Sequence, residues 1–84
     1  MYQLELSRQA SRQILKLPSD VQERIHQAIA LLGENPRHPG SKKLTDLEGY
    51  RVRVGDYRIL YAINDNFKTV IIYRIKGRGE VYRK

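Results

Sequence analysis

The sequence predicts an α+β domain in which a helical hairpin packs on one face of an antiparallel sheet, with the element order β-α-α-β-β-β. The N-terminal residues alternate between apolar and polar side chains, and two apolar stripes with the helical period of about 3.6 residues follow them. The rest of the chain contains three runs of β-forming residues that turn signals separate. A chain of 84 residues is expected to form a single domain over residues 1–84.

The first strand is predicted over residues 2–6, where the alternation is found. Ser7 is suited to cap the helix that follows, because its hydroxyl can accept a hydrogen bond from a free N–H of the first turn. Pro18 ends this helix, since proline lacks the N–H that a helix requires. The apolar stripe of the helix consists of Ala10, Ile14 and Leu17.

A second helix is predicted to begin with a capping box at residues 19–22, in which Ser19 and Gln22 cap reciprocally. Gly33 is suited to its C-terminal cap. The apolar stripe of this helix consists of Val21, Ile25, Ala28, Ile29 and Leu32. The two helices are expected to form a hairpin over one core, and residues 35–40 are expected to form a loop because they are rich in Pro, Gly and Asn.

Three consecutive strands are predicted at residues 51–54, 57–63 and 67–75, and the tail 76–84 closes the chain. If Gly55 and Asp56 form a two-residue hairpin loop, the first two of these strands pair in a defined register. The expected partners are Val54 with Tyr57, Arg53 with Arg58, Val52 with Ile59, and Arg51 with Leu60. The helix-facing side then carries Val52, Val54, Tyr57, Ile59, Tyr61 and Ile63.

The opposite side of this hairpin carries Arg51, Arg53 and Arg58 together with Leu60 and Ala62. Like charges directly across a strand pair are destabilising, so an anionic ligand would relieve the repulsion between Arg53 and Arg58. The alternative is that both arginines are simply solvated.

The register of the last strand stays open at this point. A two-residue turn at positions 65 and 66 would place on the arginine side Thr69, Ile71 and Tyr73. A three-residue turn would instead place there Val70, Ile72 and Arg74.

The formal net charge is +7, and most of it lies in the C-terminal half. Residues 1–41 carry five basic and four acidic side chains, whereas residues 42–84 carry eleven basic and five acidic ones. A basic surface of this kind attracts polyanions such as nucleic acid, and binding gains from counterion release.

Composition also excludes several classes of protein. The chain has no cysteine, which excludes a disulfide framework, a thiolate nucleophile and a cysteine zinc site. Neither a signal peptide nor a membrane span is recognisable, so we expect a soluble, cytoplasmic protein without membrane contact.

Neither a metal nor a cofactor is expected. His26 and His38 show no ligand spacing, the acidic residues do not cluster, and there is no glycine-rich phosphate loop. The side chains that remain for chemistry are those of arginine, lysine and tyrosine.

Cleavage of RNA can use this set, because RNA supplies its own nucleophile, the 2′-hydroxyl. An enzyme must then orient this oxygen, stabilise charge on the phosphate and move protons. The guanidinium fork matches phosphate oxygens, but with a pKa above about 12 it is a poor base. Tyr82 is a candidate proton shuttle, provided that nearby cations lower the pKa of its hydroxyl.

Several segments resemble the RelE/ParE superfamily of bacterial toxins, and more specifically its RelE-like branch. They are Lys43-Leu44, the segment 50–61 with the pattern Gly-x-Tyr-Arg-x-x-Tyr, and Glu-Val-Tyr-Arg at 80–83. The predicted helical hairpin, with Asn35-Pro36 after it, fits as well, so the resemblance covers essentially the whole chain.

The resemblance implies a toxin of a type II toxin–antitoxin system, with a RelE-like fold. Members of the RelE-like branch are ribosome-dependent endoribonucleases (mRNA interferases) that cleave mRNA in the ribosomal A site and inhibit translation. The implied partners are the ribosome with its mRNA and a cognate antitoxin, and operator DNA is contacted only through the antitoxin complex.

Carried over by position, the implied catalytic residues are Arg53, Arg58, Arg78 and Tyr82. Arg53 and Arg58 would contact the phosphate in the transition state. Arg78 would assist the leaving group or the scissile phosphate, and Tyr82 would act as a base or stack on the substrate. RNA and ribosome contacts are assigned to Lys42, Lys43, Arg51, Arg74, Lys76 and Arg83.

One departure from the family concerns Arg51 and Arg53, where some RelE-type members carry lysines that are candidates for the base. Two alternatives to a ribonuclease stay open. The first is a ParE-like toxin, which shares the fold but poisons DNA gyrase. The second is a non-catalytic module that binds nucleic acid or an antitoxin. The basic side of the sheet, together with Tyr82, favours the ribonuclease.

Overall fold

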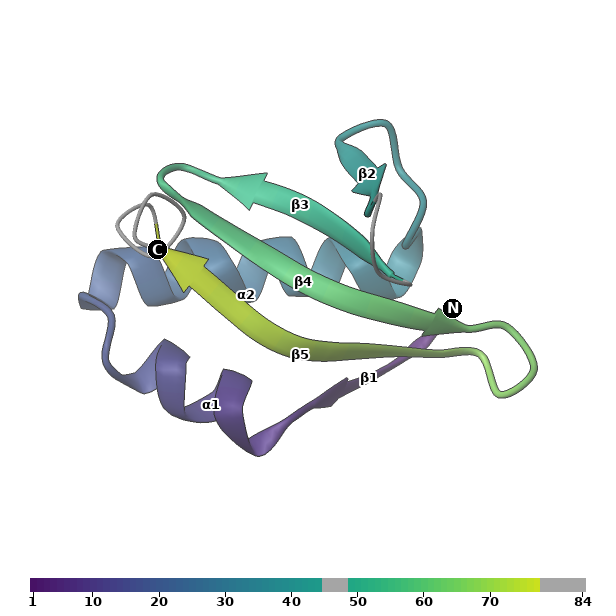
Figure 1. Ribbon diagram of the computed structural model, residues 1–84, viewed down its shortest axis with the longest axis horizontal. Coiled ribbons are helices and arrows are strands. Elements are labelled where there is room, and N and C mark those ends of the chain that lie inside the picture. The colour runs from purple at the N-terminus through teal and green to yellow at the C-terminus, as the bar shows by residue number, and fades with distance from the viewer. Residues whose placement is uncertain (45–48, 78–84) are drawn as a thin grey trace.

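The computed structural model of the chain describes residues 1–44 and 49–77. Within them, two helices pack against one face of a five-stranded sheet, which confirms the predicted α+β class (Figure 1). The elements in chain order are β1 (Gln3–Leu6), α1 (Arg8–Leu15), α2 (Ser19–Glu34), β2 (Ser41–Lys43), β3 (Tyr50–Val54), β4 (Tyr57–Asn64) and β5 (Thr69–Gly77). No helix among these residues is long and apolar enough to cross a membrane.

The sheet is mixed, and its strand order is β1-β5-β4-β3-β2. The pairs β2–β3, β3–β4 and β4–β5 are antiparallel, as predicted for the last three strands, whereas β1 runs parallel to β5. The parallel pair arises because the chain passes through both helices and three further strands before β5 returns beside β1. The sequence pattern does not reveal β2, since three residues are too few to show an alternation.

The first helix begins as predicted. Ser7 is its N-cap, and the Ser7 hydroxyl oxygen accepts a hydrogen bond from the Ala10 backbone N–H at 3.0 Å. The same hydroxyl donates to the Tyr73 carbonyl at 2.9 Å, so the cap also attaches the start of α1 to β5. The helix ends at Leu15, ahead of Pro18.

Both predicted caps of the second helix are wrong. Its N-cap is Pro18, without a side-chain cap, and the Gln22 amide donates to the Leu17 carbonyl at 2.8 Å instead of closing a capping box. The helix continues through Gly33, which is buried and whose carbonyl accepts the Tyr2 N–H at 2.8 Å. A Cβ on Gly33 would lie 3.4 Å from Leu4 Cδ1, so the glycine permits the close approach of β1 rather than a helix end.

The core lies between the helices and the sheet. It consists of Ala10, Ile14, Ile25, Ile29, Leu32, Val52, Ile59, Tyr61, Val70, Ile72 and Ile75. Val54, Tyr57 and Ile63 pack against it from the same side of the hairpin, which confirms the predicted helix-facing side. Leu60 is also buried but lies outside this cluster, as its place on the opposite side requires.

The β3–β4 hairpin has the predicted register, from Val54 opposite Tyr57 to Arg51 opposite Leu60. Its turn depends on Gly55, whose φ of 60° suits the first central position of a type II′ turn. This register places the arginines on the open face of the sheet, away from the helices.

The β4–β5 pairing combines features of both predicted registers, and its turn is longer than either predicted turn. Asn64 pairs with Thr69 across a four-residue turn in which Lys68 has a φ of 53°. A β-bulge then shifts the register, because Leu60 pairs with Arg74 while Tyr61 pairs with Ile72. As a result the open face receives Thr69 and Ile71 before the bulge, and Arg74 and Lys76 after it.

Candidate functional site

Two rows of paired residues cross the open face of the sheet and carry most of its charge. The first row runs Lys42, Arg51, Leu60, Arg74 over the strands β2, β3, β4 and β5. The second row runs Arg53, Arg58, Lys76 over β3, β4 and β5. We call the six basic residues of these two rows the basic face. Because direct partners share a side of the sheet, their charges are concentrated rather than dispersed.

The basic face is hollowed at its β2–β3–β4 end. An open hollow of about 120 Å³ is lined by Gly40, Lys42, Arg51, Arg53 and Arg58. We call it the arginine hollow. It is a shallow site that could hold a group of the size of a phosphate, and it has no depth for an internal cofactor.

The charged side chains of the arginine hollow are available to a ligand. The Arg53 Nε–H donates to the Gly55 carbonyl at 3.1 Å, so the hairpin turn restrains this guanidinium. This bond uses one of the five N–H donors of Arg53. Within residues 1–44 and 49–77, Lys42, Arg51 and Arg58 form no ion pair and no side-chain hydrogen bond. The hollow therefore presents positive charge that the described part of the chain does not neutralise, which is a property suited to an anionic ligand.

A further arginine near the hairpin turn was not predicted from the sequence. An Nη atom of Arg24, on α2, lies 3.2 Å from the position that a Cβ on Gly55 would occupy. The guanidinium therefore packs on the turn that restrains Arg53. No sequence signal could have found this contact, since it joins a solvent-facing helix position to a turn 31 residues later.

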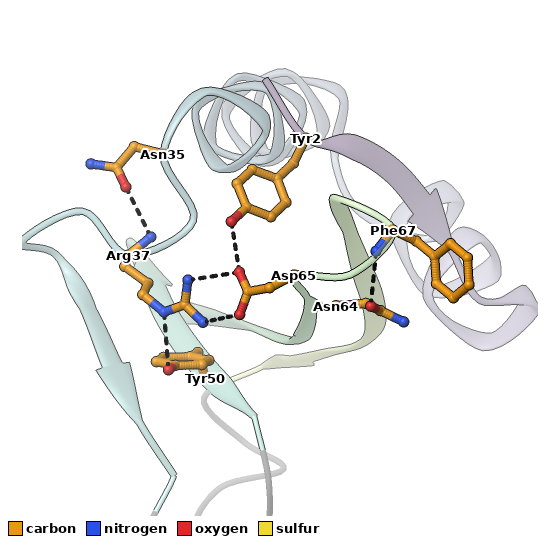
Figure 2. A network of polar contacts seen from close by, with 7 residues as sticks. All are labelled: Tyr2, Asn35, Arg37, Tyr50, Asn64, Asp65 and Phe67. Carbon is orange, nitrogen blue, oxygen red and sulfur yellow. Dashed lines mark hydrogen bonds and ion pairs between the residues drawn. The ribbon is translucent and has the colours of Figure 1, made fainter.

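The loop that carries Gly40 into the hollow is fixed by a polar network at the opposite end of the sheet (Figure 2). Arg37 forms a bidentate ion pair with Asp65, with Nη–O distances of 3.1 and 2.9 Å. The Tyr2 hydroxyl donates to the same carboxylate at 2.7 Å. Arg37 also donates from Nε to the Tyr50 hydroxyl at 3.3 Å, and its guanidinium lies 5.7 Å from the Tyr50 ring centroid.

These contacts change the acidity of the groups involved. The hydrogen bonds from Arg37 and then from Tyr2 lower the pKa of the Asp65 carboxyl to about 2. The hydrogen bond to Asp65 raises the pKa of Arg37 above its usual value and also raises the pKa of Tyr2. All three groups are on the surface, so the network positions the loop more than it stabilises the fold.

Buried contacts complete the attachment of this loop. The Tyr61 hydroxyl, in the core, donates to the Pro36 carbonyl at 2.7 Å, and the Tyr61 ring stacks on Tyr50 at 5.8 Å between centroids. At the start of β2, the His38 carbonyl accepts from both the backbone N–H and the hydroxyl of Ser41, at 2.9 and 2.8 Å. The strand that presents Lys42 to the hollow therefore follows a loop held at several points.

The structure brings together many of the residues predicted for the site. Lys42, Arg51, Arg53 and Arg58 meet around the arginine hollow, and Arg74 and Lys76 extend the same face. Lys43 pairs with Tyr50 and so points to the other side of β2, away from the hollow. The predicted residues Arg78, Tyr82 and Arg83 lie outside the described residues.

Two aspects of the chemistry follow from the described residues. None of the tyrosines among them lines the arginine hollow, so the hollow itself supplies cations but no proton acceptor. His26, His38 and the acids of this part of the chain form no group of three that could hold a metal ion. What the hollow can do is bind an anion and stabilise negative charge that develops on it.

Comparison with known proteins gives consistent matches over nearly the full chain. The family model described as "ParE toxin of type II toxin-antitoxin system, parDE" matches residues 4–82. Toxin RelG of Mycobacterium tuberculosis is 32% identical over 85 residues, which cover 99% of this chain and 98% of RelG. Toxin RelE of the same organism is 33% identical over 84 residues, which cover 98% of this chain and 87% of RelE.

The fold is matched as well. A chain in the crystal structure of the RelBE2 toxin–antitoxin complex from Mycobacterium tuberculosis is similar with a TM-score of 0.82 and 31% identity. The similarity covers 92% of this chain and 98% of that chain.

Proposed function

We propose, from the premise that this chain belongs to the RelE/ParE superfamily of type II toxin–antitoxin toxins, that it is a ribosome-dependent endoribonuclease. It would cleave mRNA in the ribosomal A site and thereby inhibit translation. The observation that carries this proposal is the convergence of Lys42, Arg51, Arg53 and Arg58 on one open hollow.

The hollow suits a scissile phosphate. Guanidinium groups bind phosphate oxygens through paired, charge-assisted hydrogen bonds, which strengthen as negative charge develops in the transition state. Arg53 is held by Gly55 and Arg58 is half-buried, so both cations are positioned before substrate arrives. Preorganisation of this kind is the main contribution that a site without a metal or cofactor can make.

The proposed reaction uses the RNA as its own nucleophile. The 2′-oxygen attacks the adjacent phosphorus and loses its proton, the P–O5′ bond breaks, and the departing 5′-oxygen gains a proton. The products are a 2′,3′-cyclic phosphate and a 5′-hydroxyl. In this scheme Arg53 and Arg58 stabilise the phosphorane oxygens, while the proton acceptor comes from elsewhere.

We assign that role to Tyr82, and assistance to the leaving group to Arg78. Gly77, the last residue of β5, pairs with Tyr57, the neighbour of Arg58. The last described residue of the chain therefore lies one position along the hairpin from Arg58 of the arginine hollow. Tyr82 is five residues further on, a distance that an extended chain spans with about 17 Å of reach.

The remaining basic residues would bind the mRNA substrate and the ribosome. The protein would act in the cytoplasm. Arg74 and Lys76 extend the basic face along β5, and we assign RNA or ribosome contacts to them and to Lys42, Lys43, Arg51 and Arg83. The similarity to a chain of a toxin–antitoxin complex supports a cognate antitoxin as the inhibitory partner. Operator DNA would be contacted only through that antitoxin complex.

A second function, poisoning of DNA gyrase, is favoured by the family model, whose description names a ParE toxin. The two functions are separated by inducing the chain in cells and mapping the 5′ ends of a translated message by primer extension. The ribonuclease gives cuts confined to translated codons, and these cuts are absent with Arg58→Ala. A gyrase poison gives an intact message together with cleaved DNA, a result that would overturn the proposal.

A further inference from the structure

A second basic surface lies on α1, outside the basic face. Arg8, Arg12 and Lys16 follow one another at intervals of four residues, so they form a single exposed row along the helix. Together with Gln9 and Gln13, they line an open, shallow depression. We call the three cations the α1 ridge. They lie opposite the buried residues Ala10 and Ile14.

The three cations of the ridge repel one another along the helix. Like charges four residues apart are unfavourable, and Arg8 in the first turn opposes the helix dipole, whereas Arg12 in the last turn favours it. The first turn of α1 contains no acidic residue, and none of the three cations forms an ion pair or hydrogen bond within the described part of the chain. A helix that only covers a core would tolerate acidic or neutral residues here, so the row of cations points to an anionic ligand.

The α1 ridge has a fixed position relative to the basic face. The Gln13 side-chain oxygen accepts from the Ile75 N–H at 2.7 Å, and the Ser7 hydroxyl donates to the Tyr73 carbonyl. Through these bonds α1 pairs with backbone groups of β5 that lie beyond the residues paired with β1. Figure 1 shows α1 next to this half of β5. The same β5 residues lead directly to Lys76.

The two basic surfaces also approach each other at one end. A depression of about 270 Å³ is lined by Lys16 and Leu17 of the α1 end and by Tyr57, Ile75 and Gly77 of the sheet, together with Gln13. Lys76 and Arg58 pair with each other next to Tyr57 and Gly77. The α1 ridge and the basic face therefore border the same end of β5, on opposite sides of the sheet.

We propose that the α1 ridge binds the phosphate backbone of RNA, as a contact separate from the scissile phosphate. The inference rests on the proposed function, because the RNA bound there is part of the ribosome or of the message being cut. A regular row of cations fits the repeating charge of a nucleic acid backbone, and arginine, lysine and glutamine are typical of contacts to phosphate and sugar.

The chemistry of the ridge disfavours a peptide as its ligand. A helix or strand that docks on a protein needs an apolar groove for its anchor residues. The depression along the ridge is lined by charged and amide side chains instead, and only Lys16 of the three cations adjoins the neighbouring depression with its apolar lining. Charge without an apolar anchor is the pattern of a backbone-binding surface for nucleic acid.

The test measures binding of the full chain to ribosomes that carry a message with 2′-deoxyribose at the A-site codon. Such a message lacks the nucleophile, so binding is measured without cleavage and whether or not the chain is a nuclease. The variants are Arg8→Gln, Arg12→Gln and Lys16→Gln, singly and together, since glutamine keeps a high helix propensity. The control, Lys68→Gln, removes one cation from the turn at the other end of β5.

We expect each ridge substitution to reduce the steepness of log K against log salt by about 0.7–0.9, and the triple variant by about 2–3, at an unchanged or raised Tm. The control should leave the slope unchanged. If the same reductions occur with a single-stranded, 2′-deoxy oligonucleotide alone, the bound backbone is that of the message. If they occur only with ribosomes, it is that of ribosomal RNA.

Ridge variants that bind ribosomes with the wild-type salt slope would overturn the inference, as would a loss restricted to binding of the antitoxin. Neither result would affect the proposed nuclease, which depends on cleavage by the arginine hollow. Conversely, if the chain binds RNA through the α1 ridge but cuts no message, the inference about the ridge stands and the proposed nuclease function is overturned.

Discussion

Arg53 and Arg58 are direct cross-strand partners in the β3–β4 hairpin, and both line the same hollow. A pair of like charges at this position costs stability, and neither guanidinium forms an ion pair within residues 1–44 and 49–77. The arrangement is understandable if the pair is selected to meet an anion. Stability and activity should therefore respond in opposite directions when the pair is broken.

The substitution Arg53→Thr tests this opposition. It removes the repulsion and places a good strand former opposite Arg58, so the free energy of unfolding should rise by about 0.2–1 kcal/mol in urea titrations. Cleavage of ribosome-bound mRNA should fall by about 10²–10³-fold, since one donor to the transition state is lost. A variant that is both less stable and fully active would contradict this reading of the pair.

Tyr61→Phe tests the attachment of the loop at its buried end. The change leaves the Pro36 carbonyl without its hydrogen bond in the core and should lower the free energy of unfolding by about 1–3 kcal/mol. Thermal unfolding should show a decrease in Tm of several degrees. Tyr57→Phe, at a half-buried position with no hydroxyl partner among the described residues, is the matched control and should change Tm little.

The Arg37–Asp65 network predicts a specific dependence of stability on acid. The folded-state pKa of Asp65 is about 2, below the value of about 3.9 for an unfolded chain. The carboxylate therefore contributes stability that is fully present above about pH 4 and is lost as the pH falls towards 2. Asp65→Asn should remove this part of the acid dependence, as followed by urea unfolding between pH 5 and 2.

The control for this experiment is Asp20→Asn, which removes a carboxylate outside the network. It should keep the wild-type decline below pH 4. Equal pH profiles for wild type and Asp65→Asn would show that the network is not formed in solution.

Gly55 tests the geometry of the turn that restrains Arg53. A β-branched residue at its φ of 60° is strained, and a Cβ would also approach the Arg24 guanidinium. Gly55→Val should therefore destabilise the chain by about 1–2 kcal/mol. Gly55→Asn, which tolerates positive φ far better, should recover most of this loss in the same denaturation assay.

The register of the arginines could be predicted from the sequence because several local signals agree on it. Gly55 permits the tight turn, and strict alternation over β3 leaves one register that buries the apolar residues. The same logic failed on β5, where a continuous apolar run hides the extra residue Tyr73 of the bulge. Because apolar and polar residues do not alternate in β5, the sequence indicates neither the length of the turn nor the position of the bulge.

Contacts between distant segments were beyond prediction for a different reason. Arg37 and Asp65 lie in a loop and a turn whose sequences carry no periodic pattern, and only the folded sheet brings them together. A glycine such as Gly33 is typical of a helix end, yet here it is required because strand β1 packs closely against the helix. Such residues satisfy tertiary requirements that local propensity does not encode.

We propose that the arginine hollow cleaves mRNA on the ribosome by means of the RNA's own 2′-hydroxyl. The most direct test is single-turnover cleavage of a ribosome-bound message, compared with the same message carrying 2′-deoxyribose 5′ to the cut. We predict cleavage of the normal message by wild type and by Lys68→Gln, no cleavage of the deoxy message, and none of either by Arg58→Ala. Cleavage of the deoxy message, or full activity of Arg58→Ala, would contradict the account.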